Sequence, residues 1–520
     1  MSCTKSNGLA FYGLPLPTVT LERNKALRRT FRESLAPSGY MHMRNAMRSL
    51  RLPPPIVSFV GAIAITLLWS PPAECTLYSG TPSNYRSLVD QLQAGDTLML
   101  AAGAYQPLRV YGRNGTPGAW IVIRGTGNPS QTVINGEPGY NTVQIDGSSY
   151  VAIENLRIDG RGYDVDGINC KDEIAHDIRI EGCTLVGLGN NQGTVAISTK
   201  EIVWNWTIRN NSILEPGTGV YLGNSGGDAP FINGVIEGNY IANPTGYCME
   251  IKHQLPYSLV SGMPTGPNRT IIRNNVFVKD ARPSEAGDRP NLLVGPFPTS
   301  GPGANDLYEI YGNFLYNNPR ESLFQGSGRM TIHDNVLVGA ASGSAALYLT
   351  DHNGALSYAT VYNNTIYGNG SGIVFATPPR VYGLATGNLI FSGQPISTCG
   401  SCTGVILRDN VTASLANASQ YVNQPSMTLG TMDFFPRSNC ATCAGSALDL
   451  SAVAGDRDYN WDFNGTTKGS FTVRGAYAGS GSNPGWQLVS GPKVGGPSSG
   501  GGPPSSDTTP PSAPVGLRAR

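Results

Sequence analysis

The sequence predicts an all-β protein, a right-handed parallel β-helix (a solenoid) with a short N-terminal capping helix. Only 14% of its 520 residues are Asp, Glu, Lys or Arg, against roughly 25% in an average soluble domain. Glycine accounts for 66 residues, about twice its usual share of ~7%. Turn formers alternate with runs rich in Val and Ile, which favours short strands joined by tight turns. A short motif that returns at similar spacings is the third observation.

The repeated motif is apolar-x-x-Asn-x-apolar. Neighbouring copies lie 22 to 38 residues apart, and such a short minimum, with longer steps where loops are inserted, is typical of one coil of a β-helix. Residues 76–480 should form about eleven to thirteen coils of this kind. Asn side chains at one bend of successive coils stack ~4.8 Å apart, so their amides can hydrogen-bond as a ladder. The ladder positions are Asn155, Cys183 (in the Asn place), Asn211, Asn239, Asn275, Asn313, Asn335, Asn364, Asn388 and Asn410.

The two ends of the chain lack the repeat. Three arginines precede an apolar run over residues 56–69, and small or turn-forming residues follow it. This is the layout of a secretory signal, and the run is shorter than the ~20 residues of a membrane span. We therefore expect residues 1–75 to be a targeting segment with its true start at Met41 to Met47, and the protein to be secreted or held at the cell surface. An uncleaved membrane anchor is the alternative.

We expect the β-helix to occupy residues 76–489, with a capping helix near 84–93. Residues 490–506 are mostly Gly, Pro and Ser, a composition typical of a flexible linker. Residues 507–520 resemble the first strand of a fibronectin type III module, cut short at the end of the chain. Two Cys-x-x-Cys pairs, Cys399/Cys402 and Cys440/Cys443, should form disulfides in an exported protein, with a zinc ribbon as the alternative.

The charge balance limits the kinds of partner. A formal net charge of +1 gives no global field toward nucleic acid or a membrane surface. We therefore expect no nucleic-acid partner and no stable membrane insertion after signal cleavage. The predicted partner is an extracellular polysaccharide, bound by a monomer.

Candidate site residues lie where the coil repeat is lengthened. The longest insertions follow Asn239 and Asn275, which directs attention to the wall over residues 245–325. Alternation in the strand at 247–254 turns Met249 and Ile251 inward, so Glu250 and Lys252 point outward side by side. His253 is a further catalytic candidate. The residues expected to bind substrate on the same wall are Tyr221, Tyr257, Glu321 and Gln325.

The repeat resembles the pectate-lyase-like superfamily of β-helix proteins. More locally, Glu250-Ile-Lys252 followed by Ile272-Arg-Asn-Asn275-Val-Phe is similar to the alginate lyase and chondroitin-B lyase family. That resemblance implies β-elimination of a uronic-acid polymer, with Lys252 as the base, Glu250 as a Ca²⁺ ligand and Asn224 as a second ligand. The family expects an additional carboxylate ligand and an Arg on the next strand, whereas here Arg289 lies just before Asn291-Leu-Leu-Val-Gly295.

Three alternatives stay open at this level. Glu250 and Lys252 can form an ordinary surface ion pair, worth at most ~1 kcal/mol. Glu250 and Glu321 can serve as the carboxylate pair of a glycoside hydrolase on the same fold, and Asp164-Val-Asp166-Gly is similar to an acidic motif of polygalacturonase-type hydrolases. The third alternative is a non-catalytic glycan-binding protein or adhesin. Of these functions, the sequence favours a polysaccharide lyase.

Overall fold

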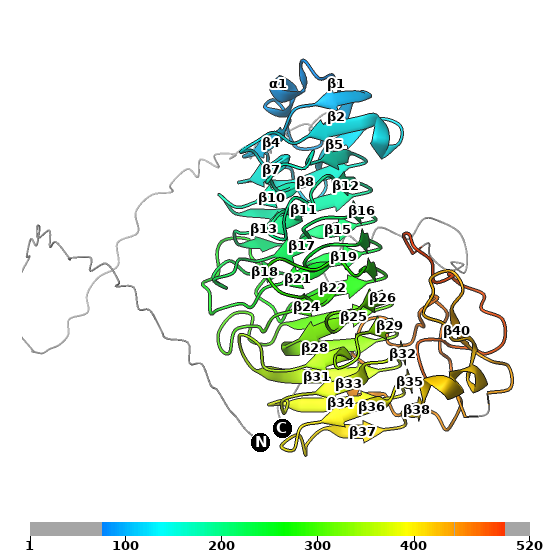
Figure 1. Cartoon of the computed structure of the whole chain (residues 1–520). Helices are drawn as coiled ribbons and strands as arrows, with labels where there is room; N and C mark the ends of the chain where they lie inside the picture. The colour runs from blue at the N-terminus through cyan, green and yellow to red at the C-terminus, as the bar shows by residue number, and fades with distance from the viewer. Residues whose placement is uncertain (1–74, 441, 494–520) are drawn as a thin grey trace, which may run out of the picture. The chain divides into compact units, whose positions relative to one another are not determined.

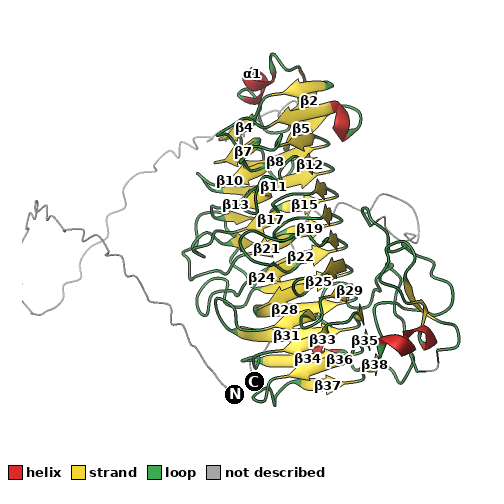
Figure 2. Cartoon of the chain, in the orientation of Figure 1, coloured by secondary structure: helices red, strands yellow, loops and turns green. Residues whose placement is uncertain are grey.

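The computed structural model describes residues 75–440 and 442–493, and within them the chain winds into a parallel β-helix (Figures 1 and 2). Three parallel sheets of 15, 11 and 12 strands run along the stack, which agrees with the expected number of coils. The predicted fold class is confirmed. Residues 1–74 of the expected targeting segment, residues 494–506 of the linker and the fibronectin-like end lie outside the described residues.

Each coil contributes one strand to each of three walls. Sheet A contains β1 (Leu77–Gly80), β2 (Thr97–Leu100), β5 (Ile121–Gly125), β8 (Ser149–Glu154), β11 (Ala175–Glu181), β15 (Thr207–Arg209), β19 (Val235–Glu237), β22 (Arg269–Arg273), β25 (Leu307–Tyr311), β28 (Gly328–His333), β31 (Leu356–Tyr362), β34 (Tyr382–Thr386) and β37 (Ile406–Arg408), with β14 (Val203–Trp204) and β18 (Phe231–Ile232) beside its main path. Sheet B contains β3 (Gly103–Tyr105), β6 (Thr132–Asn135), β9 (Arg157–Asp159), β12 (Thr184–Val186), β16 (Ser212–Leu214), β20 (Tyr240–Ala242), β23 (Val276–Val278), β26 (Phe314–Asn318), β29 (Val336–Ala340), β32 (Thr365–Tyr367), β35 (Leu389–Phe391) and β38 (Val411–Ala413). Sheet C contains β4 (Leu108–Tyr111), β7 (Val143–Asp146), β10 (Ile168–Cys170), β13 (Val195–Thr199), β17 (Thr218–Leu222), β21 (Met249–Ile251), β24 (Leu292–Val294), β27 (Phe324–Gly326), β30 (Ala345–Leu349), β33 (Ser371–Phe375) and β36 (Gln394–Thr398).

The asparagine ladder forms at the bend between sheets A and B. From Asn211 to Asn410, each side-chain Nδ2 donates to the Oδ1 of the next Asn at 2.9–3.0 Å. Asn155 is the exception, because it lies one place earlier in its coil, where φ is 54°, and bonds Gly125 and Gly127 instead. That place takes Gly, Asn or Asp in the other coils, since these residues best tolerate a left-handed backbone. The inclusion of Asn155 in the ladder was therefore wrong by one residue.

The interior of the coils is a continuous apolar core of Ile, Val, Leu and Phe side chains. Helix α1 (Tyr85–Val89) lies at its N-terminal end, within the range expected for the capping helix, and buries Tyr85 and Val89. The thiols of Cys183 and Cys248 are buried in the described part of the chain, and burial raises the pKa of each to about 12. They act as small apolar fillers.

The coils end at Ala413, earlier than the predicted residue 489. No copy of the repeat follows Asn410, so residues 414–493, here called the C-terminal segment, have no coil pattern to extend the solenoid. The segment carries a small antiparallel pair, β39 (Val422–Gln424) and β40 (Asp433–Pro436), and lies beside β29, β32 and β35 (Figure 1). The C-terminal segment also contains the 3₁₀ helices η2 (Leu415–Gln420) and η3 (Ser451–Val453). A further 3₁₀ helix, η1 (Pro129–Gln131), lies in an early coil of the β-helix.

The C-terminal segment covers an outer wall that is apolar. Val276, Phe314 and Val336 of sheet B point outward and pack against Phe434, Trp486 and other side chains of the segment. The two Cys-x-x-Cys pairs form the disulfides Cys399–Cys402 and Cys440–Cys443, so the zinc alternative is not realised by these four sulfurs. The outer face of sheet B over these coils is therefore covered by the chain itself.

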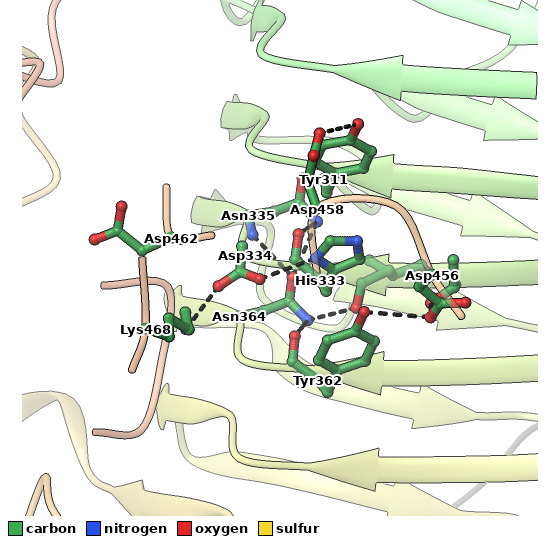
Figure 3. Close-up of polar contacts among 12 residues, drawn as sticks. Tyr311, His333, Asp334, Asn335, Tyr362, Asn364, Asp456, Asp458, Asp462 and Lys468 are labelled. Atoms are coloured by element: carbon green, nitrogen blue, oxygen red, sulfur yellow. Dashed lines mark hydrogen bonds and ion pairs between the residues drawn. The ribbon is translucent and has the colours of Figure 1, made fainter. Parts of the chain in front are cut away.

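Charged groups also dock the C-terminal segment onto sheet A, in a set we call the clamp cluster (Figure 3). The Nζ of Lys468 lies 2.7 Å from Asp334 Oδ1, and both side chains are 2% exposed. His333 is stacked between Tyr311 and Tyr362, with ring centroids 4.8 and 4.7 Å away, and its Nδ1 lies 2.9 Å from Asp334 Oδ2. Further contacts bind Tyr311 to Asp458 and Tyr362 to Asp456. His333, Asp334 and Lys468 of the clamp cluster are buried, whereas Asp456 and Asp458 are partly exposed.

Candidate active site

A cavity of about 630 Å³ opens on the outer face of sheet C. Its walls come from β13, β17 and β21 and from the loop that precedes β24. Three cations line it, Lys200, Lys252 and Arg289, together with a single acid, Glu250. The lining also includes Tyr221, Tyr247 and Asn224. The volume is within the ~300–1,000 Å³ that is usual for small-ligand pockets.

Strand register explains why these residues meet. Tyr221 of β17 is directly beside Glu250 of β21, so both project from the same outward row. Lys252 continues that alternation just beyond the end of β21, next to Gly223 in the preceding coil. Gly223 has a φ of 85°, and a Cβ there would lie 3.3 Å from the Cβ of Lys252, so the glycine gives the lysine its space.

Glu250 and Lys252 form a close ion pair. Lys252 Nζ donates to Glu250 Oε1 at 2.8 Å, and the two side chains are 15% and 4% exposed. The Nζ also lies 5.5 Å from the centre of the Tyr221 ring. An ion pair this sheltered holds the lysine in one orientation, at the wall of the cavity.

Lys200 forms a second ion pair two coils earlier, in the same row as Lys252. Its Nζ donates to Asp166 Oδ2 at 3.0 Å, and Asp166 also accepts hydrogen bonds from Asn169 and Ser198. Lys200 was not among the predicted site residues. A signal existed, because aligning 195–200 with 218–223 and 247–252 places Lys200, Gly223 and Lys252 at equivalent positions of three successive coils.

Arg289 reaches the cavity from the loop between β23 and β24. The backbone oxygen of Arg289 accepts hydrogen bonds from Lys279 and Asn318, and Gln192 holds the same loop through the backbone N–H of Ala286 at 3.0 Å. The guanidinium lies 5.6 Å from the centre of the Tyr247 ring. No acid of the described chain pairs with Arg289, whose guanidinium donates to the backbone oxygens of Ala286 and Asp288.

Burial changes the acidity of the two cavity tyrosines. Desolvation raises the pKa of Tyr221, and nearby Glu250 raises it further while Lys252 lowers it. The pKa of Tyr247 is also raised, first by burial and then by Glu250. Both phenols therefore carry their protons at neutral pH and can donate hydrogen bonds to a ligand.

The other predicted site residues lie outside this cavity. His253 turns toward the 223–229 loop, where a Cβ on Gly227 would lie 2.6 Å from its ring. Tyr257 packs against Trp204 and its neighbours. Gln325 is in the row of Glu250 but two coils on, with Leu293 between them, and Glu321 accepts the backbone N–H of Ser322.

The described residues do not fit a calcium ion. Ca²⁺ prefers six to eight oxygen ligands, several of them carboxylates. Glu250 is the one acid lining the cavity and already binds Lys252, while the Oδ1 of Asn224 accepts two backbone N–H groups. Across residues 75–440 and 442–493, no group of three or more His, Cys, Asp or Glu side chains is arranged to hold a metal. Calcium binding stays a prediction of the family resemblance.

The chain was compared with protein-family models, with curated proteins and with solved structures, and only the solved structures gave matches. No protein-family model matches the chain, and no curated protein matches it significantly. Similar solved structures include a mutant of the polysaccharide lyase family 6 alginate lyase AlyGC, at 12% identity and a TM-score of 0.44, covering 79% of this chain and 60% of that enzyme. Pectate lyase Pel9A matches at 14% identity and a TM-score of 0.43 (80% and 96% covered), and XylC in complex with xylose at 10% and 0.45 (78% and 99%).

Several of these structural neighbours are therefore polysaccharide lyases built on a β-helix. The chain spans less than two thirds of AlyGC, and at such identities the likeness concerns the fold alone. Within the described residues, no helix is long and apolar enough to cross a membrane. The activity has to be argued from the cavity itself.

Proposed function

We propose that the protein is a secreted polysaccharide lyase that cleaves a uronic-acid-containing glycan by β-elimination. The observation that carries the proposal is the cavity on sheet C, where Lys200, Lys252 and Arg289 converge with Glu250 as the one lining acid. Such a surplus of cations suits an anionic sugar chain. It does not suit a carboxylate-pair hydrolase, which needs two acids facing one substrate.

The chemistry assigns a role to each side chain. Arg289, which lacks an acidic partner, neutralises the uronate carboxylate and so makes the C5 proton easier to remove. Lys252 acts as the general base that takes that proton, a role that requires its amine to be unprotonated when the substrate binds, and the N–H groups that remain can still donate to Glu250. The electron pair forms the C4=C5 double bond as the C4–O bond breaks, and the protonated phenol of Tyr221 gives its proton to the leaving oxygen. Glu250 orients Lys252 through the 2.8 Å hydrogen bond.

An absorbance screen tests this function. The wild-type protein is incubated with alginate, polygalacturonate and glycosaminoglycans, and the unsaturated ends made by β-elimination are followed in the ultraviolet. We expect absorbance to rise with at least one polymer. New reducing ends without absorbance would replace the lyase with a hydrolase, and binding without any cleavage would leave a glycan-binding protein or adhesin. Failure to bind any acidic polymer would overturn the proposal.

A further inference from the structure

A second cavity, of about 320 Å³, lies on the same side of the β-helix. It is formed by the turns that follow the sheet C strands β21, β24, β27, β30 and β33. Its lining is largely apolar, with Pro296 and Phe297 prominent, but it also contains Arg329 and Arg380 and no Asp or Glu. The cavity is therefore another positively charged concavity.

Arg329 is a cation without an anion. In the described part of the chain it has neither an ion pair nor a hydrogen bond, and its Nε is buried without a partner. Its guanidinium lies over the ring of Tyr358, 5.3 Å from the ring centre. The nearby acid, Asp306, instead accepts hydrogen bonds from the backbone and side chain of Asn268. The side chain is only partly buried, and a guanidinium that faces a cavity without a protein anion can bind an anionic group of a ligand.

Arg380 differs from Arg329. Its guanidinium contacts Asp351 at 2.6 Å, and its side chain is 49% exposed. Arg380 is thus satisfied at the rim, which leaves Arg329 as the group that a ligand would engage.

The two cavities are neighbours along the chain. Lys252 lines the first and Gln254 lines the second, and two residues of extended chain span only ~7 Å. A single linear polymer can therefore reach both.

We propose that the Arg329 cavity is a second subsite, which binds a carboxylate or sulfate group of another sugar residue on the same acidic polysaccharide. The proposal rests on the proposed function, because the ligand of the Arg329 cavity is the same polymer that binds at Lys252 and Arg289. The ligand chemistry is an anionic oxygen group that forms a paired hydrogen bond with a guanidinium.

Chain length separates this subsite from the first cavity. Disaccharides and hexasaccharides of alginate, polygalacturonate and chondroitin sulfate are titrated into the full chain by calorimetry. Arg329→Gln should weaken hexasaccharide binding roughly 10- to 100-fold, as expected for loss of a charge-assisted hydrogen bond, and weaken disaccharide binding much less. Arg329→Lys should recover part of the loss. Arg124→Gln removes an equally charged side chain from sheet A and is the matched control.

The outcomes are distinguishable. Wild-type protein that binds none of the hexasaccharides overturns the proposed function and the subsite with it. Wild-type binding that Arg329→Gln leaves unchanged, or weakens equally for both lengths, overturns the subsite alone. For the chondroitin sulfate hexasaccharide, an effect of Arg329→Gln that disappears on desulfation identifies sulfate as the group bound. An effect that survives desulfation identifies the carboxylate. Thermal unfolding of each variant verifies that the β-helix is intact.

Discussion

Two regions outside the coil interior contain lysine–carboxylate pairs of nearly equal length, but one pair lines an open cavity and the other is buried against the C-terminal segment. Lys252 and Glu250 lie 2.8 Å apart in the sheet C cavity, and Lys468 and Asp334 lie 2.7 Å apart in the clamp cluster. The first pair faces an open concavity beside Arg289, a cation with no acidic partner. The second pair joins the C-terminal segment to the β-helix (Figure 3), and each of its side chains is only 2% exposed.

The difference teaches that a charged pair on a β-helix wall does not by itself define a site. Where an outer wall is apolar, as on sheet B, the C-terminal segment covers it. Charged pairs at the edge of the covered area, such as Lys468 and Asp334, hold the segment in place. Where the wall is polar, as on sheet C, inserted loops frame a cavity without filling it. Access for a ligand and the presence of Arg289, a cation without an acidic partner in the described chain, distinguish the candidate active site.

The largest effect should come from the cavity lysine. Lys252→Gln removes the proposed base, and a general base typically contributes 10²–10⁴-fold to rate. We expect turnover of the polymer identified in the absorbance screen to fall by about that factor. The glutamine amide can still donate to Glu250, so the unfolding midpoint should change little. Lyase activity that persists in Lys252→Gln would remove this residue from the mechanism.

The same substitution in the clamp cluster should act on stability instead. Lys468→Gln leaves Asp334 buried without its cation, and breaking a buried pair costs about 3–5 kcal/mol. The free energy of unfolding, measured in denaturant, should fall by that order, while kcat of the protein that remains folded stays near the wild-type value. Adding Asp334→Asn should restore part of the stability, because the amide removes the unpaired charge. A loss of kcat without a loss of stability would contradict the assignment.

Most of the fold could be predicted because the coil is a local repeat. The Asn positions, the alternation around Glu250 and Lys252 and the lengthened coils are all visible along the sequence. The shift at Asn155 arose because its coil has Leu156 at the ladder place, so the motif alone suggested the wrong register. The end of the coils at Ala413 was missed since residues 414–493 are rich in the same turn formers.

The site was only partly predictable, because its members come from distant coils and loops. Alternation identified Glu250, Lys252 and Tyr221, all of which line the cavity. Lys200 and Tyr247 become visible only when successive coils are aligned with one another, because alternation within a single strand does not relate one coil to the next. Arg329 had no motif at all. Arg329 stands out because no acidic side chain of the described residues pairs with it, and the absence of a partner can be recognised only in the folded structure.

Lys493 is a third lysine outside the coils, and it differs from Lys252 and Lys468 in having no carboxylate of the described chain as a direct partner. Lys493 ends the described chain with its Nζ near the backbone oxygens of Gly312 and Phe463, at 2.7 and 2.6 Å. Desolvation lowers its pKa from 10.5 to about 7, although Asp462 and Asp334 oppose the shift. Above about pH 7, the folded chain therefore releases a proton that the unfolded chain still holds.

Because the unfolded state then binds more protons, stability from this group should rise as pH increases from about 7 toward 10.5. Its full destabilising effect is present below pH 7, where Lys493 is charged in both states. The slope should be at most about 1.4 kcal/mol per pH unit. The free energy of unfolding of the wild type and Lys493→Met, compared from pH 6 to pH 9, isolates the contribution, since methionine keeps the apolar stem without a titrating group. A difference between the two proteins that does not vary with pH would show that Lys493 keeps its proton when docked.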